Sequence, residues 1–128
     1  MSLPDTYTAS LPEDFEQIMG GSAKAKSAIE LIAEERHRQI DTKGFSAAHD
    51  DEHDFGQIAA AAGCYALAGW SNTTSQELWP WEEPNPWKDQ DRWNITPAER
   101  INELVKAGAL IAAEIDRLQR SMLNPSKV

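Results

Sequence analysis

The spacing of apolar and polar residues predicts a helical protein with one irregular segment. The clearest helix start is at Thr96, a capping residue, followed by Pro97 at the first helical position and by Glu99, which completes a capping box. Glycines follow the other apolar-periodic stretches, and glycine commonly ends a helix. The expected helices span residues 11–19, 22–41, 50–68 and 97–120. We therefore predict an all-α fold, a helical bundle of three long helices preceded by one short helix.

The segment between the last two of these helices has a different composition. Residues 70–93 contain five tryptophans, together with prolines that prevent a continuous helix. An irregular segment of this length is uncommon inside a compact domain and often has a function. Two interpretations stay open. The tryptophans pack over the bundle as a plug, or the indole of Trp79 or Trp81 stacks on a nucleobase.

Length and composition indicate a single globular domain. The chain has 128 residues, of which 41% are apolar, and this is enough to bury a core without disulfides. We divide it into an N-terminal extension at 1–21, a helical core at 22–120 and a tail at 121–128. The one cysteine, Cys64, permits no disulfide within the chain and fits a reducing compartment. No signal-peptide pattern and no apolar run of about 20 residues is present, so we expect a cytoplasmic protein and no membrane association.

The net charge of the chain restricts its partners. It is −9 at pH 7, which argues against electrostatic binding of duplex nucleic acid. An anionic small substrate stays compatible with this charge, because a bound divalent cation reverses the local sign.

The helix at 97–120 carries a single apolar stripe. We expect the stripe to form its core face, and its members are Ile101, Leu104, Val105, Gly108, Ile111, Ala112, Ile115 and Leu118. Gly108 would let a partner helix approach closely. Glu103, Lys106 and Glu114 lie outside the stripe.

The helix at 50–68 turns two aspartates toward its expected core face. Counting back four and seven residues from Ile58 reaches Asp54 and Asp51. A purely local interpretation stays open, because the helix dipole favours acidic residues in the first turn of any helix.

The helix at 22–41 shows a similar pattern. The face that carries Ile32 continues to Glu35, Arg36 and Gln39. One interpretation is structural, an internal Glu–Arg pair or a helix end that leaves the core, and the other is a charged site that faces the neighbouring helix.

The short connection between these two helices makes them antiparallel neighbours, so Glu35 would face Asp51 and Asp54. Packed carboxylates repel one another unless they are protonated or bridged. Oxygen ligands suit Mg²⁺ or Mn²⁺, and Mg²⁺ usually keeps waters and takes substrate phosphates as further ligands. His49 and His53 have a spacing that can bind zinc, but no cysteine or clear third ligand accompanies them. We interpret His49 as a loop residue or as one that orients a ligand.

Several short elements follow one another in an order typical of a known family. They are ERHRQ at 35–39, GF at 44–45, HDDEH at 49–53, GQIA at 56–59, YA at 65–66, WPW at 79–81, LVKAGALI at 104–111 and AEIDRL at 113–118. In combination they resemble a phage and prophage family of dATP/dGTP diphosphohydrolases. The resemblance covers residues 27–120.

That family is similar in turn to the MazG-type all-α nucleotide pyrophosphohydrolases. The resemblance implies a helical bundle, often dimeric or tetrameric, in which acidic E-x-x-E and E-x-x-D elements hold Mg²⁺. In this chain Asp54 and Gln57 stand at the first element, and Glu103 and Lys106 stand at the second. Two of the expected carboxylates are therefore missing. Either other carboxylates replace them, or the activity has been lost.

The resemblance implies a Mg²⁺-dependent nucleotide pyrophosphohydrolase, with Mn²⁺ as the alternative metal, that cleaves a (d)NTP to the (d)NMP and pyrophosphate. The residues it would use are, as metal ligands, Glu35, Asp51, Asp54 and Glu103; as catalytic contacts to phosphate, Arg36 and Lys106; and for substrate binding, Gln39, His49, Trp79 and Trp81. Glu35 and Asp51 would replace the missing carboxylates. The expected partners are a nucleoside triphosphate and further copies of the chain.

A second hypothesis is not enzymatic. An acidic, phage-encoded helical protein could bind a host protein, with the tryptophan-rich segment as the contact surface, because exposed aromatic residues are typical interface anchors. The two hypotheses differ in whether the acidic residues converge on one site.

Overall fold

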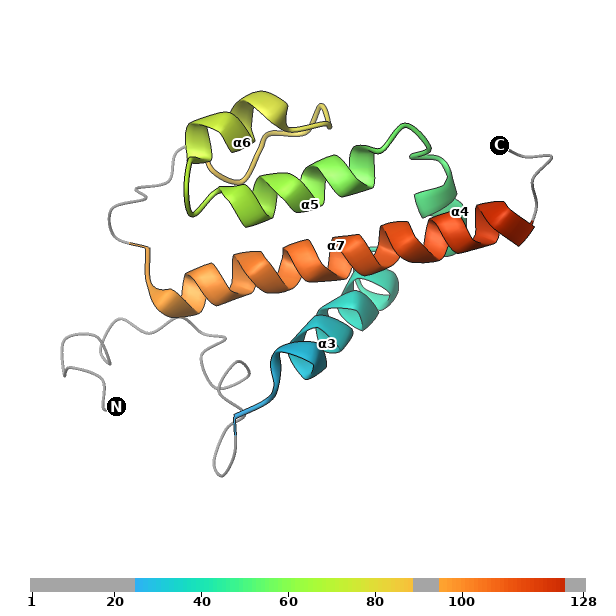
Figure 1. The fold of residues 1–128 in the computed structure, drawn as a ribbon, viewed down its shortest axis with the longest axis horizontal. Helices are drawn as coiled ribbons and strands as arrows, with labels where there is room; N and C mark the ends of the chain where they lie inside the picture. Colours follow the sequence, from blue (N-terminus) through green and yellow to red (C-terminus); the bar gives the residue numbers. More distant parts are fainter. Residues whose placement is uncertain (1–24, 89–94, 124–128) are drawn as a thin grey trace.

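The computed structural model describes residues 25–88 and 95–123. These residues form helices and no strand, and the helices are α3 (Ala28–Asp41), α4 (Ala47–Asp51), α5 (Gln57–Leu67), α6 (Asn72–Leu78) and α7 (Pro97–Leu123) (Figure 1). The predicted all-α class is confirmed. The short helix predicted at 11–19 lies outside the described residues. No helix in the described part of the chain combines the length and the apolar character that crossing a bilayer requires.

The longest helix, α7, is the one against which α3, α4 and α5 pack, and α6 packs on α5 (Figure 1). Its start confirms the predicted cap. The Thr96 hydroxyl accepts a hydrogen bond from the Glu99 amide at 3.1 Å, and the Glu99 carboxylate accepts one from the Thr96 amide at 3.4 Å. This reciprocal pair satisfies two backbone donors that the first turn leaves without partners.

The helix predicted at 22–41 begins later than expected, at Ala28. Its cap is Ser27, whose hydroxyl accepts from the Glu30 amide at 3.2 Å, while the Glu30 carboxylate accepts from the Ser27 amide at 3.3 Å. This is a second capping box of the S-x-x-E kind, which the sequence analysis overlooked.

The helix predicted at 50–68 is interrupted. α4 ends at Asp51, and α5 starts only at Gln57. Between them Gly56 has φ of +84°, in the left-handed region that glycine adopts without strain. The expected continuous helix is therefore wrong, because the chain changes direction between residues 52 and 56.

The segment predicted to be irregular contains one helix, α6. Ser71 caps it by accepting a hydrogen bond from the Thr74 amide at 3.3 Å. Inside the helix, the buried hydroxyl of Ser75 donates to the backbone carbonyl of Cys64 at 2.7 Å. Together with the packing of α6 on α5, this bond fixes the start of the tryptophan-rich segment to the helical core.

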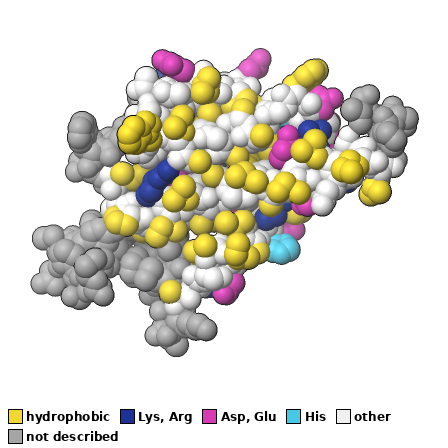
Figure 2. All heavy atoms as spheres, in the orientation of Figure 1, with side chains coloured by type: hydrophobic (Ala, Val, Ile, Leu, Met, Phe, Trp, Pro, Cys, Tyr) yellow, Lys and Arg dark blue, Asp and Glu magenta, His cyan; other side chains and the backbone are white. Residues whose placement is uncertain are grey.

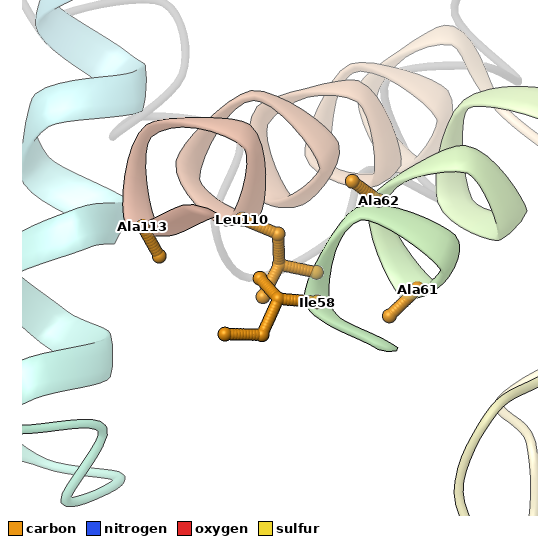
Figure 3. Packing of buried hydrophobic residues seen from close by; sticks show 5 residues of the cluster. All are labelled: Ile58, Ala61, Ala62, Leu110 and Ala113. Carbon is orange, nitrogen blue, oxygen red and sulfur yellow. The ribbon is translucent and has the colours of Figure 1, made fainter. Parts of the chain in front are cut away.

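The main apolar cluster lies between α5 and α7. Ile58, Ala61 and Ala62 of α5 pack with Leu110 and Ala113 of α7, and Figure 3 shows the Ile58 and Leu110 side chains meeting between the two helices. Alanines at these positions let the two helices approach closely. Burial of the cluster stabilises the α5–α7 pair at about 25 cal/mol for each Å² of apolar surface.

α3 packs on another face of α7 through Leu31, Ala98, Ile101 and Val105. The two helices approach closely at Gly108, where an added Cβ would lie 2.6 Å from the Cδ1 atom of Ile32. The expectation that Gly108 permits a close helix approach is confirmed.

The apolar stripe predicted to face the core lies only partly in it. Leu104, Ile111, Ile115 and Leu118 keep 46%, 50%, 51% and 48% of their surface exposed. The buried face of α7 is made instead of Ala107, Ala109, Leu110, Ala113 and their neighbours, including Glu103 and Glu114. The difference arises because α5 packs against Leu110 and Ala113 of α7, and the bulky residues of the stripe are left on another side.

Candidate functional site

Glu35 lies in the middle of α3, and its carboxylate accepts a set of hydrogen bonds. Arg38 donates to both of its carboxylate oxygens at 2.7 Å, and the Gln39 amide donates at 3.3 Å. This hydrogen bonding raises the pKa of Arg38. The predicted internal Glu–Arg pair therefore exists on α3, but Glu35 pairs with Arg38 and not with Arg36.

Tyr65 of α5 interacts electrostatically with Glu35 of α3 and with Glu103 and Lys106 of α7. Burial raises the pKa of its phenol, and the negative charges of Glu35 and Glu103 raise it further, while Arg38 lowers it. The Lys106 ammonium lies 6.0 Å from the centre of the Tyr65 ring. We call Glu35, Tyr65, Glu103 and Lys106 the Tyr65 cluster. It contains two of the predicted metal ligands and one predicted phosphate contact, from three different helices.

Glu103 is also tied to the tryptophan-rich segment. The indole N–H of Trp87 donates to its Oε2 atom at 2.8 Å, and Arg100 donates to its Oε1 atom at 3.0 Å. Trp87 is 1% exposed, so this is a buried hydrogen bond to a charged group, which is among the stronger kinds. The sequence analysis did not assign Trp87, and no local pattern in the sequence indicates a contact 16 positions away.

Arg36 pairs with a residue that the sequence analysis passed over. Its Nη2 atom lies 3.2 Å from the carboxylate of Asp50, and 3.8 Å from that of Asp116. The other carboxylate oxygen of Asp50 lies 3.1 Å from Nδ1 of His49. Asp50 is buried, so it holds both Arg36 and the His49 ring in place.

Buried polar atoms without partners accompany this pair. The Nε and Nη1 atoms of Arg36, the Oε1 atom of Gln39 and the indole nitrogen of Trp81 have no hydrogen-bond partner among the described residues. Leaving such groups unpaired costs about 1–3 kcal/mol each. Three residues that the sequence analysis singled out thus keep unused hydrogen-bonding capacity.

Asp51 and Asp54 do not face Glu35, and both are exposed. Asp51 binds Arg120 at 2.8 Å near the end of α7. Arg117 pairs with Glu114 at 2.6 Å, and this hydrogen bond, with smaller contributions from Asp54 and Asp51, raises the pKa of Arg117. The expected orientation is wrong because the periodicity counted back from Ile58 stops at the break between α4 and α5.

The structure therefore does not gather all four predicted metal ligands. Within residues 25–88 and 95–123, no group of three His, Cys, Asp or Glu side chains is placed to hold a metal ion. Glu35 and Glu103 both act on Tyr65, whereas Asp51 and Asp54 lie by Arg117. The predicted ligands divide into two sites.

The tryptophans pack on one another and on the core. Trp79 lies edge-on to Trp81, Trp87 and Tyr65, with ring centres 5.2, 5.6 and 5.8 Å apart. Its indole N–H donates to the Glu83 carbonyl at 3.0 Å. This arrangement is that of a plug over α5, and a free indole face for base stacking stays a prediction.

An aromatic row continues from Trp81 toward α3. The rings of Trp81, His53, His49 and Phe45 follow one another with centres 5.8, 5.0 and 4.8 Å apart, and the Phe45 amide donates to the Gln39 carbonyl at 2.9 Å. The row links Trp81 by ring contacts to Phe45, whose backbone is hydrogen-bonded to that of Gln39. His49 and Gln39, predicted to bind substrate, therefore belong to one continuous set of contacts.

No family model, no curated protein and no solved structure matches this chain. The functional interpretation therefore depends on the resemblance described above and on the geometry of these residues.

Proposed function

We propose that this protein is a Mg²⁺-dependent nucleotide pyrophosphohydrolase that cleaves a (d)NTP to the (d)NMP and pyrophosphate. The observation that carries the proposal is the Tyr65 cluster, where Glu35 of α3 and Glu103 of α7 both influence the pKa of one phenol of α5. Lys106 lies against the same ring. The order of motifs across residues 27–120 supports the same activity. Mn²⁺ is the alternative metal.

Glu35 and Glu103 of the Tyr65 cluster have the chemistry of magnesium ligands, and binding the ion would require their hydrogen bonds to Arg38 and Arg100 to be exchanged. Glu35 and Glu103 offer carboxylate oxygens, the ligand type that Mg²⁺ prefers, and the ion commonly completes its shell with water and substrate phosphate. A bound Mg²⁺ would neutralise phosphate charge and help to activate water. In this proposal Asp51 and Asp54 are not ligands of the same ion, because they lie beside Arg117.

The cationic side chains near the cluster suit a triphosphate. Lys106 provides a compact positive charge beside Glu103, on the next turn of α7. Arg36 has two donors free among the described residues and is oriented by Asp50. A guanidinium binds phosphate through a pair of parallel hydrogen bonds, whereas an ammonium acts as a point charge. Gln39, His49 and Trp81 would then contact the nucleoside.

Pyrophosphate release from a panel of NTPs and dNTPs, with Mg²⁺ and with Mn²⁺, tests the activity. We expect Glu35→Gln and Lys106→Ala each to lower kcat/KM by about 100-fold, the loss typical of removing one charge-stabilising group. Asp41→Asn, which changes an exposed acidic residue on the same helix as Glu35, is the matched control and should keep full activity. No metal-dependent pyrophosphate release from any nucleotide by the unaltered protein would refute the proposal.

The binding-protein hypothesis keeps two supporting observations. The first is that the predicted metal ligands do not converge on one site, and the second is the exposure of aromatic side chains. Trp70 and Phe55 are each 90% exposed, and exposed aromatic side chains anchor interfaces. Trp79 and Trp87 pack into the core, so the contact surface of such a protein would not be the whole tryptophan-rich segment. A bacterial cytoplasmic location and a homo-oligomeric state complete the proposal for the enzyme.

A further inference from the structure

We infer that the outer side of α5 is a docking surface for a cationic amphipathic helix of a partner protein. Its residues, which we call the α5 surface, are Phe55, Ala59, Gly63, Ala66 and Trp70. Figure 2 shows hydrophobic side chains over this part of the molecule, with acidic side chains beside them. The inference goes beyond the proposed enzymatic activity, because it holds whether or not the chain cleaves nucleotides.

Two sides of α5 are covered and a third is open. α7 covers the side on which Ile58 lies (Figure 3), and α6 and Trp87 cover the side next to Cys64. The exposed residues of the third side are Ala59, Gly63 and Ala66. An added Cβ at Gly63 would lie in open space. A helix that is apolar all round is normally covered on every side, so this third side is suited to a partner.

Exposed aromatic side chains lie at both ends of α5. Phe55 precedes the helix and Trp70 follows it, and each is 90% exposed. The 11 residues of α5 between them span about 16 Å, which is about three turns of a partner helix. The small residues of the third side would let the backbone of such a helix approach closely, while the two rings contact its apolar side chains as anchors.

The charge of this part of the chain favours a cationic partner. Residues 44–87 contain no lysine or arginine, and their acidic residues are Asp50, Asp51, Glu52, Asp54, Glu77, Glu82 and Glu83. Asp50 and Asp51 pair with arginines of α3 and α7. In contrast, Glu52, Glu77 and the two glutamates at 82 and 83 are exposed and form no ion pair with a described residue. The negative potential around the α5 surface is therefore left for a partner to neutralise.

The same charges disfavour the other occupants of an apolar surface. A second copy bound here would bring carboxylates against carboxylates, and like charges that face each other weaken binding. Anionic lipids and nucleic acids are repelled for the same reason. A helix with an apolar stripe flanked by lysines is complementary to both features, because its stripe would pack on the α5 surface while its lysines meet the acidic field of residues 44–87.

The α5 surface is distinct from the Tyr65 cluster. Tyr65 is two residues from Gly63, which turns its side chain about 160° from that position at 100° per residue. Variants of one feature therefore test it without changing the other.

Binding of a synthetic peptide tests the inference. The probe is a fluorescently labelled peptide of about 18 residues with leucines on one helical face and lysines on the other, and its control has glutamate in place of lysine. We expect fluorescence anisotropy at pH 7 to show binding of the lysine peptide and none of the glutamate peptide. Raising the salt concentration from about 0.05 M to about 0.5 M should weaken binding by roughly 10-fold, because salt screens the charges.

Matched variants locate the binding on the α5 surface. Trp70→Ser should raise the dissociation constant by roughly 30-fold, the loss typical of removing an aromatic anchor, whereas Ile29→Ser, at a position 75% exposed on α3, should leave it unchanged. Glu77→Lys should weaken binding and lower its salt dependence, and Asp41→Lys, on α3, is its control. Glu35→Gln should keep full affinity, so that this inference and the proposed enzyme can fail separately.

Several results would overturn the inference. They are equal affinity for the two peptides, no binding of the lysine peptide, and unchanged affinity in Trp70→Ser when circular dichroism shows native helicity. Binding to neutral phosphatidylcholine vesicles in place of the lysine peptide would identify a lipid surface as the occupant instead. Self-association of the full chain that Trp70→Ser abolishes, without peptide binding, would identify a second copy.

Discussion

Tyr65 is the residue through which three helices influence one another. Its ring packs edge-on against Trp79 and Trp87, and its phenol lies in the field of Glu35 and Glu103. The carboxylates hold arginines, and the ring holds Lys106 at its face. A phenol in this position reports on the charge state of the proposed metal ligands.

The titration of Tyr65 should change when Glu35 loses its charge. Burial is the main cause of the raised pKa, and the Glu35 charge adds to it, so Glu35→Gln should lower the pKa of Tyr65 part of the way toward its ordinary value. The sign for stability follows from the raised pKa. The contribution of the protonated Tyr65 phenol to the free energy of unfolding is fully present below the ordinary pKa of tyrosine. It is lost as the pH rises through the folded-state pKa.

Tyrosinate absorbance measures this effect. The chain has two tyrosines, so a Tyr7→Phe background leaves Tyr65 as the reporter. Asp41→Asn should leave the titration midpoint in place. An unchanged midpoint in Glu35→Gln would mean that the two side chains do not interact in solution.

Trp87 should contribute strongly to stability. Its ring is buried against Cys64, Ala68 and Tyr65, and its N–H bonds to Glu103. Trp87→Ala should lower the free energy of unfolding by about 3–5 kcal/mol. Trp87→Phe keeps most of the packing but leaves a buried carboxylate oxygen without its donor, and should cost about 1–3 kcal/mol.

Urea unfolding of the variants measures these losses. Leu78→Ala, at a position 61% exposed on α6, should stay within about 0.5 kcal/mol of the unaltered protein. Equal stabilities for Trp87→Ala and Leu78→Ala would show that the tryptophan-rich segment does not pack on α5 as described.

At the scale of helices, the residues that α7 presents to α3 and α5 determine how closely these two helices pack against it. α7 presents Leu110 and Ala113 to α5 and Gly108 to α3, and the added Cβ distances at Gly108 show that α3 lies close to its axis. Small residues contribute little area each, but they allow the larger side chains of the partner helix to pack in the groove. The other bulky residues of α7, such as Ile111 and Ile115, lie outside the contacts with α3 and α5 and stay half exposed.

Gly108→Ala tests how tightly α3 and α7 pack against each other. Alanine favours a helix by about 1 kcal/mol over glycine, but its Cβ would lie 2.6 Å from Cδ1 and 2.9 Å from Cγ1 of Ile32. Overpacking of this kind costs about 1–3 kcal/mol, so we expect no gain in stability, or a net loss. Ile32→Val removes the Cδ1 atom and should recover part of the helix-propensity gain in the double variant. Additive effects in a double-mutant cycle of urea unfolding would show that the two residues do not contact each other.

At the scale of the whole molecule, the polar and apolar features lie on different sides of α7. Lys106 and Ile115 are nine residues apart, which turns their side chains about 180° from each other at 100° per residue. Ile115 and the other half-exposed apolar residues of its stripe therefore point away from Lys106 of the Tyr65 cluster.

The sequence by itself determined the fold class and many local features. Apolar periodicity, the capping box at Thr96 and the absence of strand patterns were enough for an all-α prediction, because these signals act within a few residues. The motifs also pointed to Glu35, Glu103 and Lys106, which the structure brings around Tyr65. The break before α5 escaped prediction, since the single glycine at 56 was not read as an interruption.

Only the tertiary structure decided which face of each helix is covered and which charges pair. Periodicity shows which residues of α7 share a face, but it does not show that α5 packs against Leu110 and Ala113 and leaves Ile111 and Ile115 exposed. The contacts of Arg36 with Asp50 and of Trp87 with Glu103 join residues 14 and 16 positions apart. Such pairs depend on how whole helices and connections are placed, and no local interaction along the chain specifies that placement.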